Sequence, residues 1–162
     1  MRTVMVFAIG LIVGATMVPG SAQSTRIPGI NNMNHVAIAV PDMNAALDFY
    51  MNKMGFGEGF IVRNDKKEPT LAYVQVSKDT FVELNPVNAN RPAGLNHYGL
   101  HVQDLKAFQA TLKQRGVNVT DVRPGGDPSS FSANVTDPNG IRIELFQFGP
   151  ESLQGKAIGS WK

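Results

Sequence analysis

The chain has 162 residues, with 15 lysines and arginines against 13 aspartates and glutamates, and no cysteine. The basic residues are scattered and do not alternate with aromatic ones, so no nucleic-acid-binding surface is predicted. The absence of cysteine excludes disulfides and a lipid-modified N-terminal cysteine. The length suits one domain with a sizeable hydrophobic core.

The first 22 residues have the pattern of a secretory signal peptide. Met1-Arg2 gives a short cationic start, an apolar run follows from Val4 to Val18, and small residues end at Ala22. The apolar run is shorter than the roughly 20 residues that a membrane-spanning helix needs. We therefore expect cleavage after Ala22 and export to the periplasm or the medium, with no membrane attachment afterwards. An uncleaved N-terminal anchor is the alternative.

The next part of the chain predicts a strand followed by a helix. Residues 23–33 carry Gly, Pro and Asn without periodicity, so we expect an irregular lead-in segment. Apolar residues then alternate from His35 to Val40, which is typical of a strand with two distinct faces. Pro41-Asp42 predicts a turn and an N-cap for a helix to about Met54, which Gly55 would end.

The same order of elements occurs twice. The first half continues with three predicted strands, at Gly57–Val62, Leu71–Val76 and Thr80–Asn85. After a linker rich in Pro and Gly, the order returns as a strand at His97–Val102, a helix from about Asp104 to Arg115, and strands near Val117–Val122, Ser130–Thr136 and Arg142–Phe148. We predict one α+β domain over residues 34–148, built from module one (about 34–86) and module two (about 96–148), with a C-terminal tail at 149–162.

The repeat carries His and Glu at matching offsets. Glu83 follows His35 by 48 positions, and Glu144 follows His97 by 47 positions. All four are predicted on the sheet face that the helices do not cover, where Gly99 would leave room for a ligand. Unpaired carboxylates on an inward face are costly, and two imidazoles with two carboxylates suit one divalent Zn, Ni, Co, Fe or Mn ion. The alternative is a metal-free cluster in which these groups pair with one another.

Other residues of this face are candidate substrate contacts: His101, Asn134, Arg142 and Phe146. An alternating strand places His101 on the same face as His97, about 13 Å away, where it could contact a substrate at the cavity mouth. Its alternative is an exposed histidine at a strand end. Arg142 could hold a substrate carboxylate through two hydrogen bonds or form a salt bridge with a neighbouring acid. Phe146 could form an apolar wall or simply belong to the core.

Several segments resemble the vicinal oxygen chelate superfamily, which includes glyoxalase I, methylmalonyl-CoA epimerase, fosfomycin-resistance proteins, extradiol dioxygenases and bleomycin-resistance proteins. The resemblance is carried by His35–Asp42, Asp48–Tyr50, Met54–Phe56 and Asp137–Leu145. It implies paired βαβββ modules whose sheets curl into a cup around one divalent metal. Glyoxalase-like members take their ligands from the first and last strand of each module, and the matching residues here are His35, Glu83, His97 and Glu144.

The resemblance implies a metal-dependent lyase or isomerase of the glyoxalase I type, similar to lactoylglutathione lyase. Such an enzyme transfers a proton through a metal-stabilised enediolate of a small oxygenated substrate, with Glu83 or Glu144 as the catalytic carboxylate. A second hypothesis is an iron-dependent dioxygenase of the extradiol type, and a third is a non-catalytic small-molecule-binding protein of the bleomycin-resistance type. Glu83 favours the first, because dioxygenase and fosfomycin-modifying relatives typically use two His and one Glu. We expect a homodimer, with the modules paired either within one chain or across the dimer.

Overall fold

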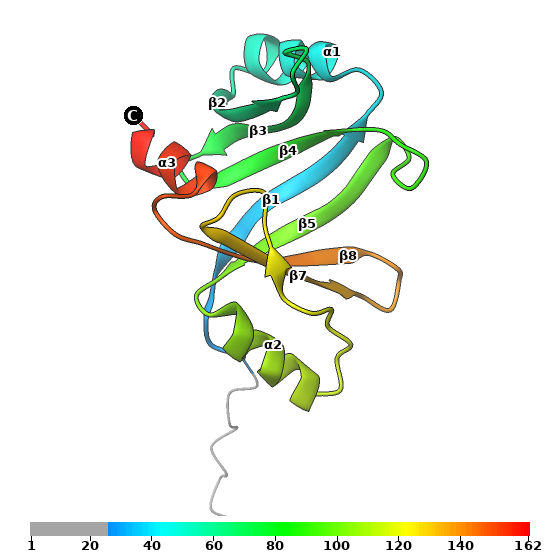
Figure 1. Cartoon of the computed structure of the whole chain (residues 1–162), viewed down its shortest axis with the longest axis vertical. Coiled ribbons are helices and arrows are strands. Elements are labelled where there is room, and N and C mark those ends of the chain that lie inside the picture. The colour runs from blue at the N-terminus through cyan, green and yellow to red at the C-terminus, as the bar shows by residue number, and fades with distance from the viewer. Residues whose placement is uncertain (1–25) are drawn as a thin grey trace, which may run out of the picture.

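The computed structural model describes residues 26–162, and the signal peptide predicted for residues 1–22 lies outside the described residues. Within that range the strands form one eight-stranded sheet in the order β2-β3-β4-β1-β5-β8-β7-β6 (Figure 1). The strands are β1 (Ile30–Val40), β2 (Gly57–Arg63), β3 (Pro69–Ser77), β4 (Thr80–Pro86), β5 (Gly94–Val102), β6 (Arg123–Pro124), β7 (Ser130–Thr136) and β8 (Arg142–Phe148). The helices are α1 (Met43–Leu47), which continues as the π-helical segment η1 (Asp48–Lys53), α2 (Leu105–Gln114) and α3 (Leu153–Ser160).

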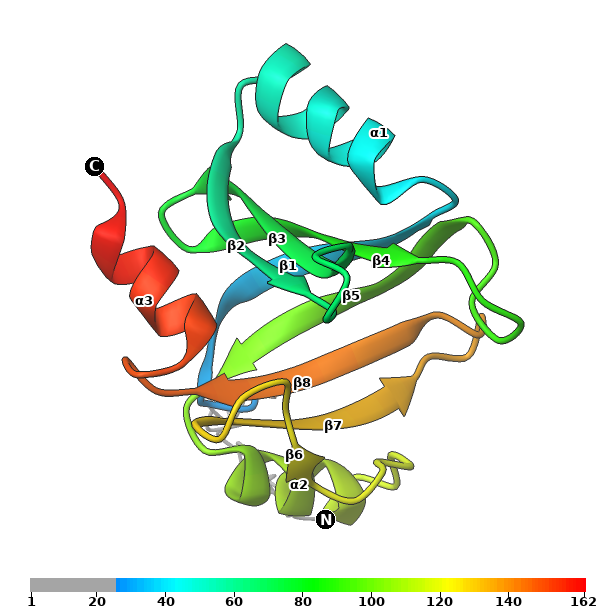
Figure 2. The same cartoon turned by 45° about the horizontal axis from the view of Figure 1, so that its top comes forward.

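The two modules join through their first strands. Strand β1 runs parallel to β4 in module one, β5 runs parallel to β8 in module two, and β1 and β5 are antiparallel neighbours at the centre of the sheet. The sheet curves, so that β2 and β3 lie on one side of its concave face and β7 and β8 on the other (Figure 2). The predicted α+β fold of two βαβββ modules is confirmed, and in this structure the modules pair within one chain.

Matching residues begin and end the two module helices. The side chains of Asp42 and Asp104 each accept a hydrogen bond from the backbone N–H three residues further on, at 2.9 and 3.0 Å. These are N-caps, which satisfy donors that the first helical turn leaves unpaired. Gly55 and Gly116 follow the helical segments with φ angles of 74° and 79°, where glycine carries no steric penalty. The helix predicted from Asp42 to about Met54 is thus present, as α1 followed by η1.

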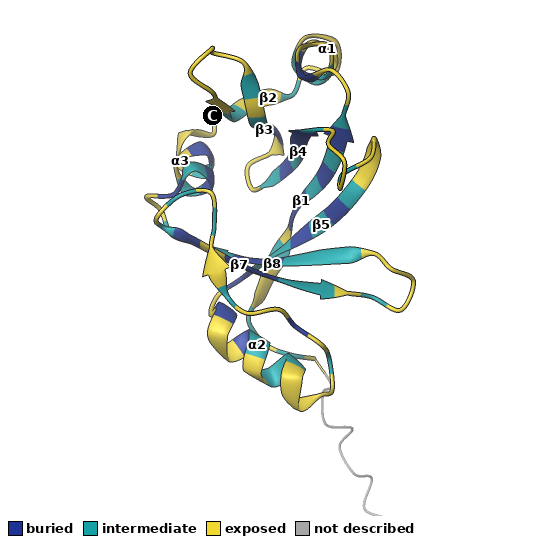
Figure 3. Cartoon of the chain, turned by 45° about the vertical axis from the view of Figure 1, so that its right-hand side comes forward, coloured by how far each residue is buried: buried dark blue, intermediate teal, exposed yellow. Residues whose placement is uncertain are grey.

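The apolar faces of α1 and α2 cover the outer side of the sheet. Met43 and Leu47 of α1 pack on a cluster from β3 and β4, and Leu105 and Phe108 of α2 pack on a cluster from β5, β7 and β8. Burial of each such side chain contributes about 1.5–3 kcal/mol. Figure 3 shows the exposed side of α2 turned away from the sheet. Among the described residues, no helix is long and apolar enough to cross a membrane.

Two strands differ from the sequence prediction, and the predicted C-terminal tail contains the helix α3. Strand β1 begins at Ile30, within the predicted lead-in segment, because residues 30–33 continue the pairing with the end of β5, through register shifts. The strand predicted at Val117–Val122 is wrong, since that stretch makes only an isolated bridge between Val119 and Val135. Pairing with β7 occurs instead at β6, which has two residues. Both errors arise from long-range pairing that local sequence does not encode.

Candidate metal centre

The four predicted ligands lie together on the four central strands of the sheet: His35 (β1), Glu83 (β4), His97 (β5) and Glu144 (β8). The strand register explains how they meet. Ala37 of β1 has Glu83 and His97 as its neighbours on the two flanking strands. In module two the equivalent position is Gly99, which has His35 and Glu144 on its two sides. Small residues at these two positions leave space for the larger side chains beside them.

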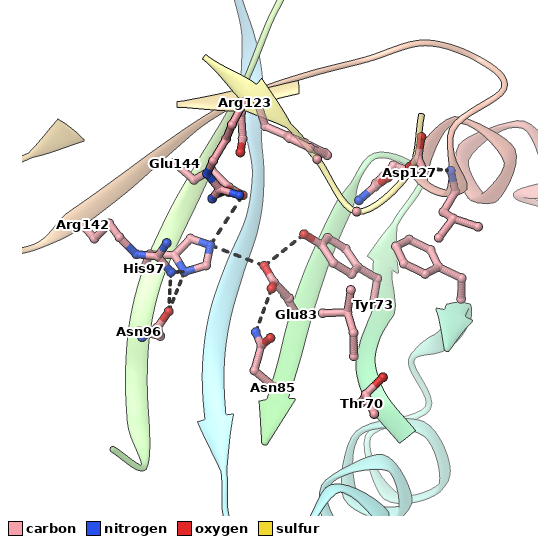
Figure 4. Close-up of a pocket in the computed structure, with 18 of the residues that line it drawn as sticks. Thr70, Tyr73, Glu83, Asn85, Asn96, His97, Arg123, Asp127, Arg142 and Glu144 are labelled. Carbon is pink, nitrogen blue, oxygen red and sulfur yellow. Dashed lines mark hydrogen bonds and ion pairs between the residues drawn. The ribbon is translucent and has the colours of Figure 1, made fainter. Parts of the chain in front are cut away.

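The donor atoms of this cluster are close enough to share one metal ion. His35 Nε2 lies 3.2 Å from His97 Nε2, and Glu83 Oε2 lies 3.3 and 3.4 Å from these two nitrogens. Glu144 Oε2 lies 3.4 Å from His35 Nε2 and 3.7 Å from His97 Nε2. Metal–ligand bonds of about 2.1 Å place adjacent donors about 3.0–3.4 Å apart. The donor types and the spacing of these four residues therefore fit a divalent metal. Figure 4 shows Glu83, His97 and Glu144 at the edge of the cavity.

An asparagine orients each histidine from behind. Asn34 Oδ1 lies 3.1 Å from His35 Nδ1, and Asn96 Oδ1 lies 2.9 Å from His97 Nδ1. An imidazole that donates from Nδ1 presents Nε2 as the ligand atom. A metal-binding histidine usually donates its other ring N–H to an oxygen acceptor of this kind. Sequence reasoning assigned no role to these asparagines, although the Asn-His pair occurs in both modules and is the signal that could have found them.

The two carboxylates are held differently. Glu83 accepts hydrogen bonds at both oxygens, from the Tyr73 hydroxyl to Oε2 at 3.0 Å and from Asn85 Nδ2 to Oε1 at 2.7 Å. Glu144 Oε1 instead has Arg123 Nη2 at 3.7 Å, on a side chain that is 55% exposed. Glu83 is therefore fixed in place by buried donors, whereas Glu144 keeps one oxygen with more freedom. Neither Tyr73 nor Arg123 was predicted from the sequence, because each lies on a different strand from the carboxylate that it contacts.

The carboxylates and histidines of the cluster shift one another's pKa values. Burial alone would raise the pKa of Glu83 and of Glu144, but hydrogen bonds and the positive charge of His35 and His97 outweigh burial and hold both pKa values below their ordinary range. Burial would lower the pKa of His97, yet its two carboxylate partners raise it. Ionised carboxylates are the form that binds a metal. Burial, with the neighbouring carboxylate charges, raises the pKa of Tyr73, so its hydroxyl stays a donor.

The cluster borders a cavity of about 370 Å³ on the concave face. Its lining includes the predicted substrate contacts Arg142 and Phe146, and also Glu83, His97 and Glu144. Residues that sequence reasoning missed also line it, among them Tyr73, Asn85, Arg91, Arg123 and Gln154. Arg142 lies on the predicted face, but its guanidinium donates to Asn96 and to Asn134 and also contacts His97 Nδ1. These contacts differ from the acid partner that the sequence suggested.

Two of the predicted substrate contacts do not line this cavity. The His101 ring stacks on Phe148 with ring centroids 3.9 Å apart, and Asn31 lies within hydrogen-bond distance of its Nδ1. The Asn134 amide oxygen accepts a hydrogen bond from Arg142 at 3.3 Å. The prediction that His101 and Asn134 contact substrate therefore receives no support from their placement, because strand alternation fixes a face but not a distance from the cavity.

The family model described as "Glyoxalase/Bleomycin resistance protein/Dioxygenase superfamily" matches residues 32–145. The ethylmalonyl-CoA/methylmalonyl-CoA epimerase of Cereibacter sphaeroides is 29% identical over 133 residues, which span 73% of this chain and 98% of that protein. The metallothiol transferase FosB of Staphylococcus epidermidis is 26% identical over 122 residues, or 72% of this chain and 81% of that protein.

The crystal structure of methylmalonyl-CoA epimerase from Mycobacterium tuberculosis has the same fold. It superposes with a TM-score of 0.65 at 22% identity and covers 79% of this chain and 95% of that one. The family match spans most of the chain and both modules that carry the four ligand candidates. This chain belongs to the glyoxalase/bleomycin resistance protein/dioxygenase superfamily, the vicinal oxygen chelate superfamily that its sequence resembles.

Proposed function

We propose that this protein is a divalent-metal-dependent isomerase or lyase that moves a proton at the carbon beside a carbonyl group. The observation that carries the proposal is the pair of buried carboxylates beside two histidines at the edge of a cavity, one carboxylate fixed and the other freer. The similarity to proteins named methylmalonyl-CoA epimerase supports proton-transfer chemistry. The glyoxalase I reaction, expected from the four-ligand pattern, belongs to the same class.

His35, Glu83, His97 and Glu144 would hold the metal. When bound, the metal would supply Lewis acidity to a substrate carbonyl and so make the neighbouring C–H more acidic. Tyr73 keeps Glu83 in position through the 3.0 Å hydrogen bond to Oε2, so that this carboxylate acts as a fixed ligand.

Glu144 is the residue that we assign to proton transfer. Its Oε2 faces both histidines, while its Oε1 has only Arg123 near it among the ion pairs of the described residues. A carboxylate that reaches the cavity can accept a proton from one face of a carbon and return it. The Arg123 guanidinium would stabilise the carboxylate form of Glu144, which is the form that accepts the proton.

Proton exchange in D₂O tests this proposal whatever product the substrate finally yields. The metal-loaded protein is mixed with methylmalonyl-CoA, or with the hemithioacetal of glutathione and methylglyoxal, and deuterium incorporation beside the carbonyl is followed by NMR. We expect exchange that depends on metal and falls by about 10²–10⁴-fold in Glu144→Gln, with metal still bound. Glu83→Gln should instead weaken metal binding. The absence of exchange with both substrates in the metal-loaded protein would contradict the proposal for these substrate classes.

We also propose that the mature protein begins at Gln23, is exported, and acts as a homodimer. Sequencing of the N-terminus of protein from the periplasmic fraction tests the first two statements, and light scattering after gel filtration tests the third. A mature chain that retains Met1, or a monomer at working concentration, would contradict them.

A further inference from the structure

The C-terminal helix α3 is an element that the family match does not cover. The match ends at residue 145, whereas α3 spans Leu153–Ser160. The helix begins at the buried Ser152, whose hydroxyl accepts a hydrogen bond from Gly155 N at 2.9 Å. Figures 1 and 2 show α3 beside the β2–β3 end of the sheet. Its sequence contains Gly155 and Gly159, which lower helix propensity, so contacts with the rest of the protein must stabilise it.

Contacts on two sides fix α3 to the concave face of the sheet. Ala157 packs in a buried cluster with Tyr73 and Phe81, and its carbonyl accepts a hydrogen bond from Gln75 at 3.3 Å. At the start of the helix, Leu153 N donates to Asp127 of the loop between β6 and β7 at 3.4 Å. The helix thereby joins the two halves of the cup, and Leu153 and Gln154 line the cavity.

Gln154 brings an unpaired acceptor to this cavity. The side chain is buried, at 5% exposure, and lies close to the Tyr73 hydroxyl. That hydroxyl donates its own hydrogen to Glu83, so the end of the Gln154 side chain that can pair with it is the NH₂ group. The remaining atom, Oε1, has no hydrogen-bond partner among the described residues. A buried carbonyl without a donor is costly, so this position favours a ligand that carries an N–H or O–H group.

Two further features of the same cavity define the ligand. Ser132 Oγ is buried, lines the cavity and has no hydrogen-bond partner in the part of the chain that the structure describes. The cavity is also bordered by the guanidinium-bearing side chains of Arg91, Arg123 and Arg142. Arginine binds carboxylates through paired N–H donors. The polar groups together suit a small anion that carries a hydroxyl group.

We propose that α3 completes the substrate pocket and that Gln154 determines specificity, by accepting a hydrogen bond from the hydroxyl of a small hydroxylated carboxylate. The proposal extends the proposed function, and it rests on that function because it assumes that the substrate binds in this cavity. In this proposal the arginines bind the negative charge of the substrate, and Gln154 of α3 recognises its hydroxyl group.

The experiment compares two probes that differ by one hydroxyl, malonate and hydroxymalonate, by isothermal titration of the full chain. Metal coordination could itself favour the hydroxyl, so the quantity of interest is the change in the affinity ratio between wild type and Gln154→Met. This substitution keeps the length of the side chain and removes its acceptor. We expect the preference for hydroxymalonate to fall by about tenfold while malonate affinity stays within about threefold.

Two variants make the result specific. Gln154→Glu keeps acceptor oxygens, so it should retain the preference while its added charge weakens binding of both anions. Gln114→Leu, at an exposed position at the end of α2, should match wild type in both affinities. An unchanged ratio in a folded Gln154→Met, or no binding of either probe to wild type at millimolar concentration, would overturn the proposal. If Gln154→Met loses the preference for hydroxymalonate but the wild type shows no proton exchange in D₂O, the result supports this pocket and counts against the proposed reaction.

Discussion

Gly99 on β5 lies directly opposite His35 on β1, and the imidazole of His35 occupies the space that a side chain at position 99 would need. A Cβ atom added at Gly99 would overlap Cε1, Nε2 and Nδ1 of the ring. The sequence suggested that this glycine leaves room for a ligand molecule. The structure shows instead that it leaves room for the ring of His35, one of the four residues of the candidate metal centre.

Gly99→Ala should therefore displace His35 and weaken the metal site. We expect the free energy of unfolding to fall by about 1–3 kcal/mol, because an extra methyl group enters a filled region of the core. Metal affinity, measured by competition with a chromophoric chelator, should fall as well. Gly57→Ala is the control, since a Cβ atom there meets its neighbours at 3.8 Å, which is ordinary contact. Wild-type metal affinity in a folded Gly99→Ala protein would contradict this account.

Asn34→Ala should reduce metal affinity by about 10–100-fold, because it removes the acceptor that sets the orientation of His35. Asn34 also donates to the carbonyl of Asp79 at 3.1 Å, and Asn32 donates to the same carbonyl at 3.3 Å. Asn32→Ala therefore loses the contact with Asp79 without any change at His35, which makes it a matched control. Equal metal affinities for the two variants would show that Asn34 has no role in positioning the ligand.

Tyr73→Phe should destabilise the protein by about 1 kcal/mol, because the buried Glu83 carboxylate loses one of its two donors. The pKa of Glu83 should rise, and metal binding should weaken more at acidic than at neutral pH. Thermal unfolding and metal titration at two pH values measure both effects. Tyr50→Phe, on η1 against the core cluster of module one, serves as the control, and the same change in metal binding for both variants would count against the assigned role.

The order of strands and helices in each module could be predicted from local sequence, because alternation, Asp caps and Gly stops act over a few residues. The four ligand candidates could be predicted because a repeat places them at equivalent positions. Helix α3 could not be predicted from the sequence, because its two glycines disfavour a helix and its stability comes from packing on Tyr73 and Phe81. The partners of Glu83 and Glu144 were also hidden, because Tyr73 and Arg123 meet them only through strand pairing.

His101 should lower the stability of the protein in acid. Burial lowers the pKa of His101 from 6.5, and the charge of Asp79 only partly opposes this. The unfolded chain then binds a proton over a pH range in which the folded protein does not. The stabilising contribution is complete above pH 6.5 and is lost as the pH falls below that value toward the folded pKa.

His101→Phe keeps an aromatic ring against Phe148 and removes the titration. Relative to wild type, the variant should therefore gain stability at about pH 5.5 compared with about pH 7.5. Urea unfolding at the two pH values measures this difference. If the effect of the substitution is the same at both pH values, the burial of His101 does not contribute to acid sensitivity.

Elemental analysis of the mature protein, purified without an affinity tag or chelator, tests the metal centre most directly. We predict about one equivalent of Zn, Ni, Co, Fe or Mn per chain. The double variant His35→Ala/His97→Ala should lose this metal, whereas His101→Ala, which changes the third and last histidine of the chain, should retain it. A wild-type protein that binds no metal even after reconstitution, or a double variant that keeps a full equivalent, would contradict the four-residue metal site.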